Sequence, residues 1–121
     1  MKKFILIVVG LLISNLAFAQ LTNEKITTAN EELAQKILQT LSLSAEMYAS
    51  ENKMKFPSRI EDLTNASRPS INENFCDGAE HFGYSFTCIF STDGYTITAN
   101  PATLGVTGTK SYTISTGGIL K

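Results

Sequence analysis

The sequence predicts an α+β domain, in which a long N-terminal amphipathic helix packs on an antiparallel meander of three or four strands. Apolar residues recur at helical spacing over residues 23–52, a stretch without Pro or Gly. After Gly83 the apolar period falls from about 3.6 to about 2, and turn residues separate the later segments. Neither element can bury its apolar face alone, so the helix is expected to cover one face of the sheet.

The helix is expected over residues 23–52 because its apolar stripe is broad. Thr28-Ala29-Asn30-Glu31 has the form of a capping box, so the helix is predicted to begin there after a looser lead-in over residues 20–27. It is predicted to end near Asn52, because Asn tolerates the left-handed conformation and Pro57 follows closely.

A short second helix is predicted directly after Pro57. Ser58-Arg59-Ile60-Glu61 forms another capping box, and Leu63 ends the apolar side of the segment. Residues 64–82 are rich in Asn, Ser, Pro and Gly, which predicts an irregular loop.

Strands are predicted from residue 84 onward. Asp93-Gly94 signals a tight turn between two alternating segments, which should pair as a hairpin. Residues 100–110 are predicted to form a loop because they contain Pro and two Gly. Residues 111–115 alternate as a third strand, and Gly117-Gly118 turns the chain into a short fourth. The buried faces predict one core built from Leu33, Ile37, Leu41 and Tyr48 against Phe86, Ile97 and Ile114.

Residues 1–19 have the order of a secretory signal peptide. A basic start precedes an apolar run over residues 4–18, and a small-x-small site predicts cleavage between Ala19 and Gln20. Cleavage leaves residues 20–121 as one domain, secreted or periplasmic. The alternative is a retained apolar helix that anchors the chain in the inner membrane, although the run is shorter than the roughly 20 residues of a membrane span.

The charge balance argues against a nucleic-acid partner. The chain has 10 basic and 11 acidic residues. Lys2 and Lys3 leave with the predicted leader, so eight basic residues face 11 acidic ones and the net charge becomes −3. No basic patch of the kind that binds nucleic acid is left in this composition.

Cys76 and Cys88 are the only cysteines and are predicted to form a disulfide, because paired thiols oxidise in exported proteins. Cys88 lies on the apolar face of its strand, so Cys76 must come within about 7 Å of it, Cα to Cα, from the loop. His81 lies between them and would complete a set of three metal ligands. Structural zinc takes four ligands and oxidised sulfurs are not thiolates, so we expect a surface imidazole and no metal site.

No catalytic set is recognisable. His81 is the only histidine, and the acidic pairs Glu31-Glu32 and Glu61-Asp62 are sequence neighbours that do not share a helix face. The Gly105–Lys110 segment lacks the spacing of a phosphate-binding loop and precedes a strand. We expect a protein that is not an enzyme and needs no cofactor, and an enzyme with an unrecognised site is the least favoured alternative.

Two stretches resemble bacterial type IV pilins and type II secretion pseudopilins. Residues 45–63, with Ser50-Glu51-Asn52 before Phe56-Pro57, are similar to the end of the long pilin helix and the loop after it. Residues 94–112 are similar to the last two strands, and Gly118-Ile119-Leu120 to the terminus. The resemblance covers roughly residues 33–121. The front differs, because the chain lacks a standard prepilin leader with its Gly and aromatic junction.

The resemblance implies a pilin-like domain with a binding or assembly function. We expect an exported module that binds other envelope or secreted proteins as an accessory to a type IV pilus or type II secretion apparatus. The alternative is a membrane-anchored, divergent pseudopilin that serves as a structural fibre subunit. Major pseudopilins hold calcium in an acidic C-terminal loop, whereas Asp93 is the only acidic residue here after position 80, so no calcium site is expected.

Overall fold

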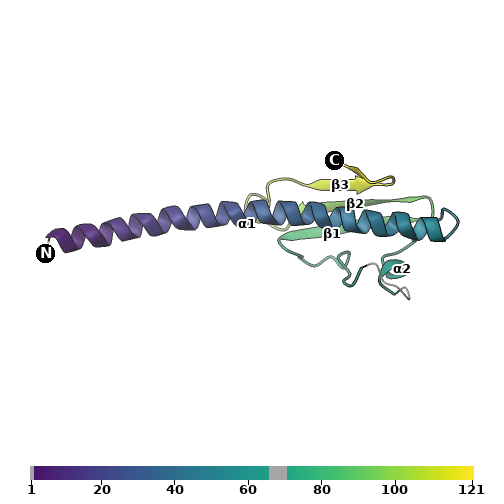
Figure 1. The fold of residues 1–121 in the computed structure, drawn as a ribbon, viewed down its shortest axis with the longest axis horizontal. Helices are drawn as coiled ribbons and strands as arrows, with labels where there is room; N and C mark the ends of the chain where they lie inside the picture. The colour runs from purple at the N-terminus through teal and green to yellow at the C-terminus, as the bar shows by residue number, and fades with distance from the viewer. Residues whose placement is uncertain (1, 66–70) are drawn as a thin grey trace.

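The computed structural model describes residues 2–65 and 71–121, with side chains described from Glu24 onward. The chain forms a long helix, a short helix and a four-stranded antiparallel sheet, which confirms the predicted α+β class. The long helix α1 spans Lys2–Glu51. The sheet lies along the second half of α1, while the first half projects beyond it (Figure 1).

The predicted start of the helix at Thr28 is wrong, because α1 continues without interruption through this region. A capping side chain is needed only where backbone N–H groups lack helical partners, and a continuous helix supplies those partners. Two polar side chains of the supposed capping box serve another purpose. Asn30 Nδ2 donates to the carbonyl of Thr107 at 3.1 Å, and Glu31 Oε1 accepts from the backbone N–H of Thr109 at 2.8 Å.

α1 ends at Glu51, next to the predicted Asn52, but the left-handed residues are Lys53 (φ 57°) and Met54 (φ 64°). The Met54 N–H donates to the carbonyl of Ala49 at 2.8 Å, which closes the last turn. Asn52 contributes through its side chain, which donates to a carbonyl of that turn at 2.7 Å. The helix therefore ends where expected, but the left-handed residues that follow it begin one position after Asn52, at Lys53.

The second helix, α2 (Glu61–Thr64), begins later than the predicted capping box requires. A turn over residues 58–60 comes first, and the N-cap residue Ile60 makes no side-chain cap bond. The backbone N–H and the hydroxyl of Ser58 both approach Asp62 Oδ2, at 3.0 and 3.3 Å. Asp62, and not Glu61, thus supplies the carboxylate that accepts a hydrogen bond from the backbone N–H of Ser58.

The sheet has the strand order β1-β2-β3-β4, and every neighbouring pair is antiparallel. Its strands are β1 (Tyr84–Ser91), β2 (Gly94–Pro101), β3 (Tyr112–Ser115) and β4 (Ile119–Leu120). The predicted meander is confirmed with four strands. Residues 100 and 101 belong to β2 and not to the following loop, because both pair with β1.

The β1–β2 turn is centred on Thr92 and Asp93, because Ser91 pairs with Gly94 across it. The predicted turn at Asp93-Gly94 is therefore displaced by one residue. Gly94 has a different role, since a Cβ there would collide with the hydroxyl of Thr116. This close approach lets the Thr116 hydroxyl accept a hydrogen bond from the N–H of Tyr95 at 2.9 Å.

The core lies between α1 and the face of the sheet formed by β2 and β3, with contributions from β1. Five of the seven residues predicted to form it are buried together, and Leu33 and Tyr48 are half-buried at its edge. The buried five are Ile37, Leu41, Phe86, Ile97 and Ile114. The predicted packing of helix on sheet is confirmed.

Candidate functional site

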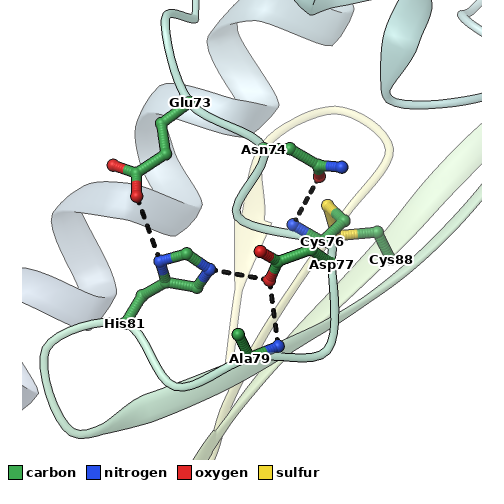
Figure 2. A network of polar contacts seen from close by, with 7 residues as sticks. All are labelled: Glu73, Asn74, Cys76, Asp77, Ala79, His81 and Cys88. Carbon is green, nitrogen blue, oxygen red and sulfur yellow. Dashed lines mark hydrogen bonds and ion pairs between the residues drawn. A yellow bond between two sulfur atoms is a disulfide. The ribbon is translucent and has the colours of Figure 1, made fainter.

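The loop before β1 is fastened by the predicted disulfide between Cys76 and Cys88. Their Cα atoms lie 5.7 Å apart, within the limit for such a bond, which confirms the pairing. Cys88 is half-buried on the side of β1 that faces the core, and Cys76 reaches it from the loop (Figure 2). Both sulfur atoms belong to the disulfide, so neither is a nucleophile or a metal ligand while the bond is intact.

His81 is not the surface imidazole expected from the sequence, because its side chain is only 10% exposed. Figure 2 shows the ring between two carboxylates. Nε2 lies 2.8 Å from Oδ1 of Asp77, and Nδ1 lies 3.3 Å from Oε1 of Glu73. The ring also packs edge-on against Phe75, with a centroid distance of 5.2 Å. Aromatic contact on the core side therefore removes the imidazole from solvent.

Short-range hydrogen bonds shape the loop that carries this cluster. Asn74 Oδ1 accepts from the N–H of Cys76, and Asp77 Oδ1 accepts from the N–H of Ala79, both at 2.9 Å. The hydrogen bond from His81 and that from Ala79 lower the pKa of Asp77. The arrangement holds Asp77 ionised beside a hydrogen-bond donor and thereby orders the loop.

Among residues 24–65 and 71–121, no three His, Cys, Asp or Glu side chains are placed to hold a metal ion. In each acidic pair singled out in the sequence, the two carboxylates have different surroundings in the structure. Glu31 contacts Thr109 whereas Glu32 is exposed, and Asp62 contacts Ser58 whereas Glu61 is exposed. Neither pair forms a dyad of carboxylates for acid–base chemistry.

A groove of about 680 Å³ lies between α1 and the β2–β3 loop, residues 102–111. Its walls include Glu24, Ile26 and Glu31 from the helix and Val106 and Thr109 from the loop. This is where the Gly105–Lys110 segment lies, between two strands and without the helix that a phosphate loop requires. The groove therefore lies where the β2–β3 loop meets α1.

Helix side chains hold the β2–β3 loop in place. The Thr27 hydroxyl donates to the carbonyl of Val106 at 2.9 Å, and Glu31 accepts from the hydroxyl and N–H of Thr109. Both hydrogen bonds from Thr109 lower the pKa of Glu31, and the bond from the hydroxyl has the larger effect. Burial and the nearby Glu31 carboxylate raise the pKa of Tyr84 to about 12, and the Tyr84 hydroxyl donates to the Lys110 carbonyl at 2.8 Å.

A second polar cluster fixes the opposite end of the sheet, and no motif in the sequence indicated it. Glu46 Oε1 accepts from the hydroxyl of Tyr95 and from the N–H of Gly117, both at 2.7 Å. The hydroxyls of Ser42 and Tyr95 are hydrogen-bonded at 2.6 Å, and burial raises the pKa of Tyr95. One helix carboxylate thus ties α1 to β2 and to the β3–β4 turn.

The predicted cleavage site between Ala19 and Gln20 falls within α1, at residues whose side chains lie outside the described part of the chain. Where side chains are described, the structure holds no helix of the length and apolarity needed to cross a membrane.

The comparisons with known proteins identify no relative. No family model, no curated protein and no solved structure matches the chain. The resemblance to pilins therefore stays a prediction from the sequence, and the function is argued below from the geometry of the helix and sheet.

Proposed function

We propose that the chain is a non-enzymatic, pilin-like assembly module of the bacterial envelope, in which α1 is the element that joins it to other proteins. The observation that carries this proposal is the asymmetry of α1. Its second half is covered by the sheet on one side, while its first half extends beyond the sheet as the same continuous helix (Figure 1).

The outer face of the covered half supports an assembly role. Leu43 and Met47, one helical turn apart, are 62% and 49% exposed on the side of α1 that faces away from the core. A helix that packs on one side and shows apolar side chains on the other can receive a second helix there. The flanking Lys36 and Ser50 are also exposed, as at the rim of an interface.

The continuous path of α1 favours the form of this module in which residues 4–18 are retained as an inner-membrane anchor. A retained stem needs a helix that passes from the apolar run into the domain without a break, and α1 provides one. The second candidate is the exported form cleaved after Ala19, which is favoured by the signal-like order of residues 1–19. Both forms place the disulfide in an oxidising compartment.

Site-specific photo-crosslinking in the native bacterium tests the assembly role. A crosslinking amino acid at Leu43 or Met47 should yield adducts that mass spectrometry assigns to a second copy or another envelope protein. The same group at Thr87, exposed on the face of the sheet opposite α1, is the matched control and should yield fewer adducts. Equal yields at Leu43 and Thr87 would contradict the proposal.

The mass of the chain purified from the native bacterium separates the two forms. A chain that keeps residues 1–19 and fractionates with the inner membrane supports the retained stem. A chain that begins at Gln20 rejects the stem and leaves the exported module.

A further inference from the structure

We propose that the partner of α1 is a second copy of this chain, and that the two helices pair side by side in the same direction about a two-fold axis. The inference rests on the proposed function in its retained-stem form and names the partner that the proposed function leaves open. The pairing surface is a stripe of six residues along α1, which we call the seam. The seam consists of Ala29, Glu32, Lys36, Thr40, Leu43 and Met47.

The seam is one continuous surface, because its members follow one another at intervals of three or four residues on a single helix. All six are exposed in the described part of the chain. Leu38 and Ala45, which pack on the sheet, lie on the opposite side of α1. So do Thr27 and Glu31, which hold the β2–β3 loop. A second helix along the seam therefore does not meet the sheet of either copy.

The stems fix the relative direction of the two helices. In the retained-stem form, residues 4–18 of each copy lie in the same membrane and enter it from the same side. The two helices are therefore parallel, and a two-fold axis along them gives both copies the same contacts. About such an axis, each seam residue lies near its counterpart and near the residues one helical turn away from that counterpart.

Leu43 and Met47 form the apolar part of the seam. They are 62% and 49% exposed, and in the parallel pair each lies near both of the same residues in the other copy. The Thr40 hydroxyl, one turn earlier, already donates to the carbonyl of Lys36 at 2.9 Å, so its methyl group is free to face the second helix. Ala29, at the other end of the seam, is small enough to let the helices approach.

Glu32 and Lys36 indicate that the occupant is a second copy. They carry opposite charges one turn apart, and within residues 24–65 and 71–121 neither side chain takes part in an ion pair. In the parallel pair, Glu32 of each copy lies beside the partner's Lys36, which gives two reciprocal charge pairs. The face is therefore complementary to itself. Charged pairs that flank a helix seam select the partner and its orientation, and a helix without the matching charges is disfavoured.

Cysteine cross-linking of the full-length chain tests whether two copies meet at the seam. Cys76 and Cys88 form a disulfide, so the substitution Leu43→Cys adds the only free thiol. Membranes of the native bacterium treated with copper phenanthroline should then yield a disulfide-linked dimer. Thr96→Cys, exposed on the face of the sheet opposite α1, is the matched control and should remain a monomer.

Charge reversal tests the partner and the direction of the pairing. In the Leu43→Cys chain, Lys36→Glu or Glu32→Lys alone places four like charges in the seam, and each should lower the association constant of the dimer by roughly tenfold. Both positions are exposed, so the core is unaffected. Produced together with tags of different size, the two variants should regain the dimer as a mixed pair. Pairing within one helix cannot cause this rescue, because neither chain carries both signs.

Mixed dimers in nearly native yield support the pairing. Equal dimer yields in all charge variants, or no recovery in the mixture, overturn it. A Leu43→Cys chain that stays monomeric, while the photo-crosslinking group at Leu43 gives adducts with other envelope proteins, overturns the second copy as partner and leaves the assembly role intact. The absence of adducts of either kind at Leu43 overturns the assembly role, and this pairing with it.

Discussion

Two regions pack beside the sheet, the second half of α1 and the loop before β1, and different interactions hold each of them there. On one flank the second half of α1 covers β2 and β3 with closely packed apolar side chains such as Leu41 and Ile97, both fully buried. On the other flank the loop over residues 71–83 is fastened to β1 by a disulfide, and contacts of His81 with Asp77 and Glu73 hold the loop in shape. Apolar burial responds little to pH or to reductant, whereas the fastening of the loop responds to both.

The largest expected effect is a cavity in the helix flank. Leu41→Ala should lower the free energy of unfolding by about 2–5 kcal/mol, because the lost side chain is fully buried between α1 and the sheet. Lys36→Ala, at an exposed position of the same helix, should change it by less than about 0.5 kcal/mol. Denaturant melts of the two variants measure the difference. Equal, mild effects would mean that α1 does not dock on the sheet as described.

Removal of the disulfide should have the next largest effect. Replacing Cys76 and Cys88 by Ser opens a loop with a sequence separation of 12, which the chain-entropy model values at about 3 kcal/mol. Hydrogen exchange should speed up most in residues 71–83, whereas residues 34–49 of α1 should lose only the protection that corresponds to the lower global stability. A uniform loss of protection would show that the two flanks do not behave as separate regions.

The smallest effect should be the acid response of the loop. Hydrogen bonds from His81 and Ala79 lower the pKa of Asp77 in the folded chain. The stability that Asp77 confers is therefore present above its unfolded pKa of about 3.9 and is lost as the pH falls through the lower folded value. Thermal melts between about pH 6 and pH 2 should show a shallower acid decline in Asp77→Asn than in the native chain. Parallel curves would exclude this role of Asp77.

The regular elements were predictable because their signals are local. Helical spacing selected Ile37 and Leu41, and alternation selected Phe86, Ile97 and Ile114, and all five meet in the core. The predicted turn positions were displaced by one residue where a local motif competed with a longer-range contact. Gly94 resembles a turn glycine, but it is needed for the approach of Thr116.

The polar clusters were not predictable because they join residues far apart in the sequence. From the sequence alone, Glu46 would be expected to point into solvent from the helix. In the structure it contacts Tyr95 and Gly117, which belong to other elements. The imidazole of His81 is removed from solvent by Phe75, which a loop of irregular conformation brings against it. The spacing of Asp77 and His81 by four residues was visible in the sequence, but only the folded loop makes it a contact.

The direction of α1 relative to the strands has a mechanical consequence. α1 runs along the strands it covers (Figure 1), so a pull on its projecting half would load the interface between helix and sheet in shear. In shear, the packed contacts resist together, whereas a peeling force would break them one after another. Glu46, which bonds to both Tyr95 and Gly117 near the far end of the interface, would bear part of that load. A stem with this geometry transmits tension into β2 and β3 and leaves the disulfide on β1 outside the direct path.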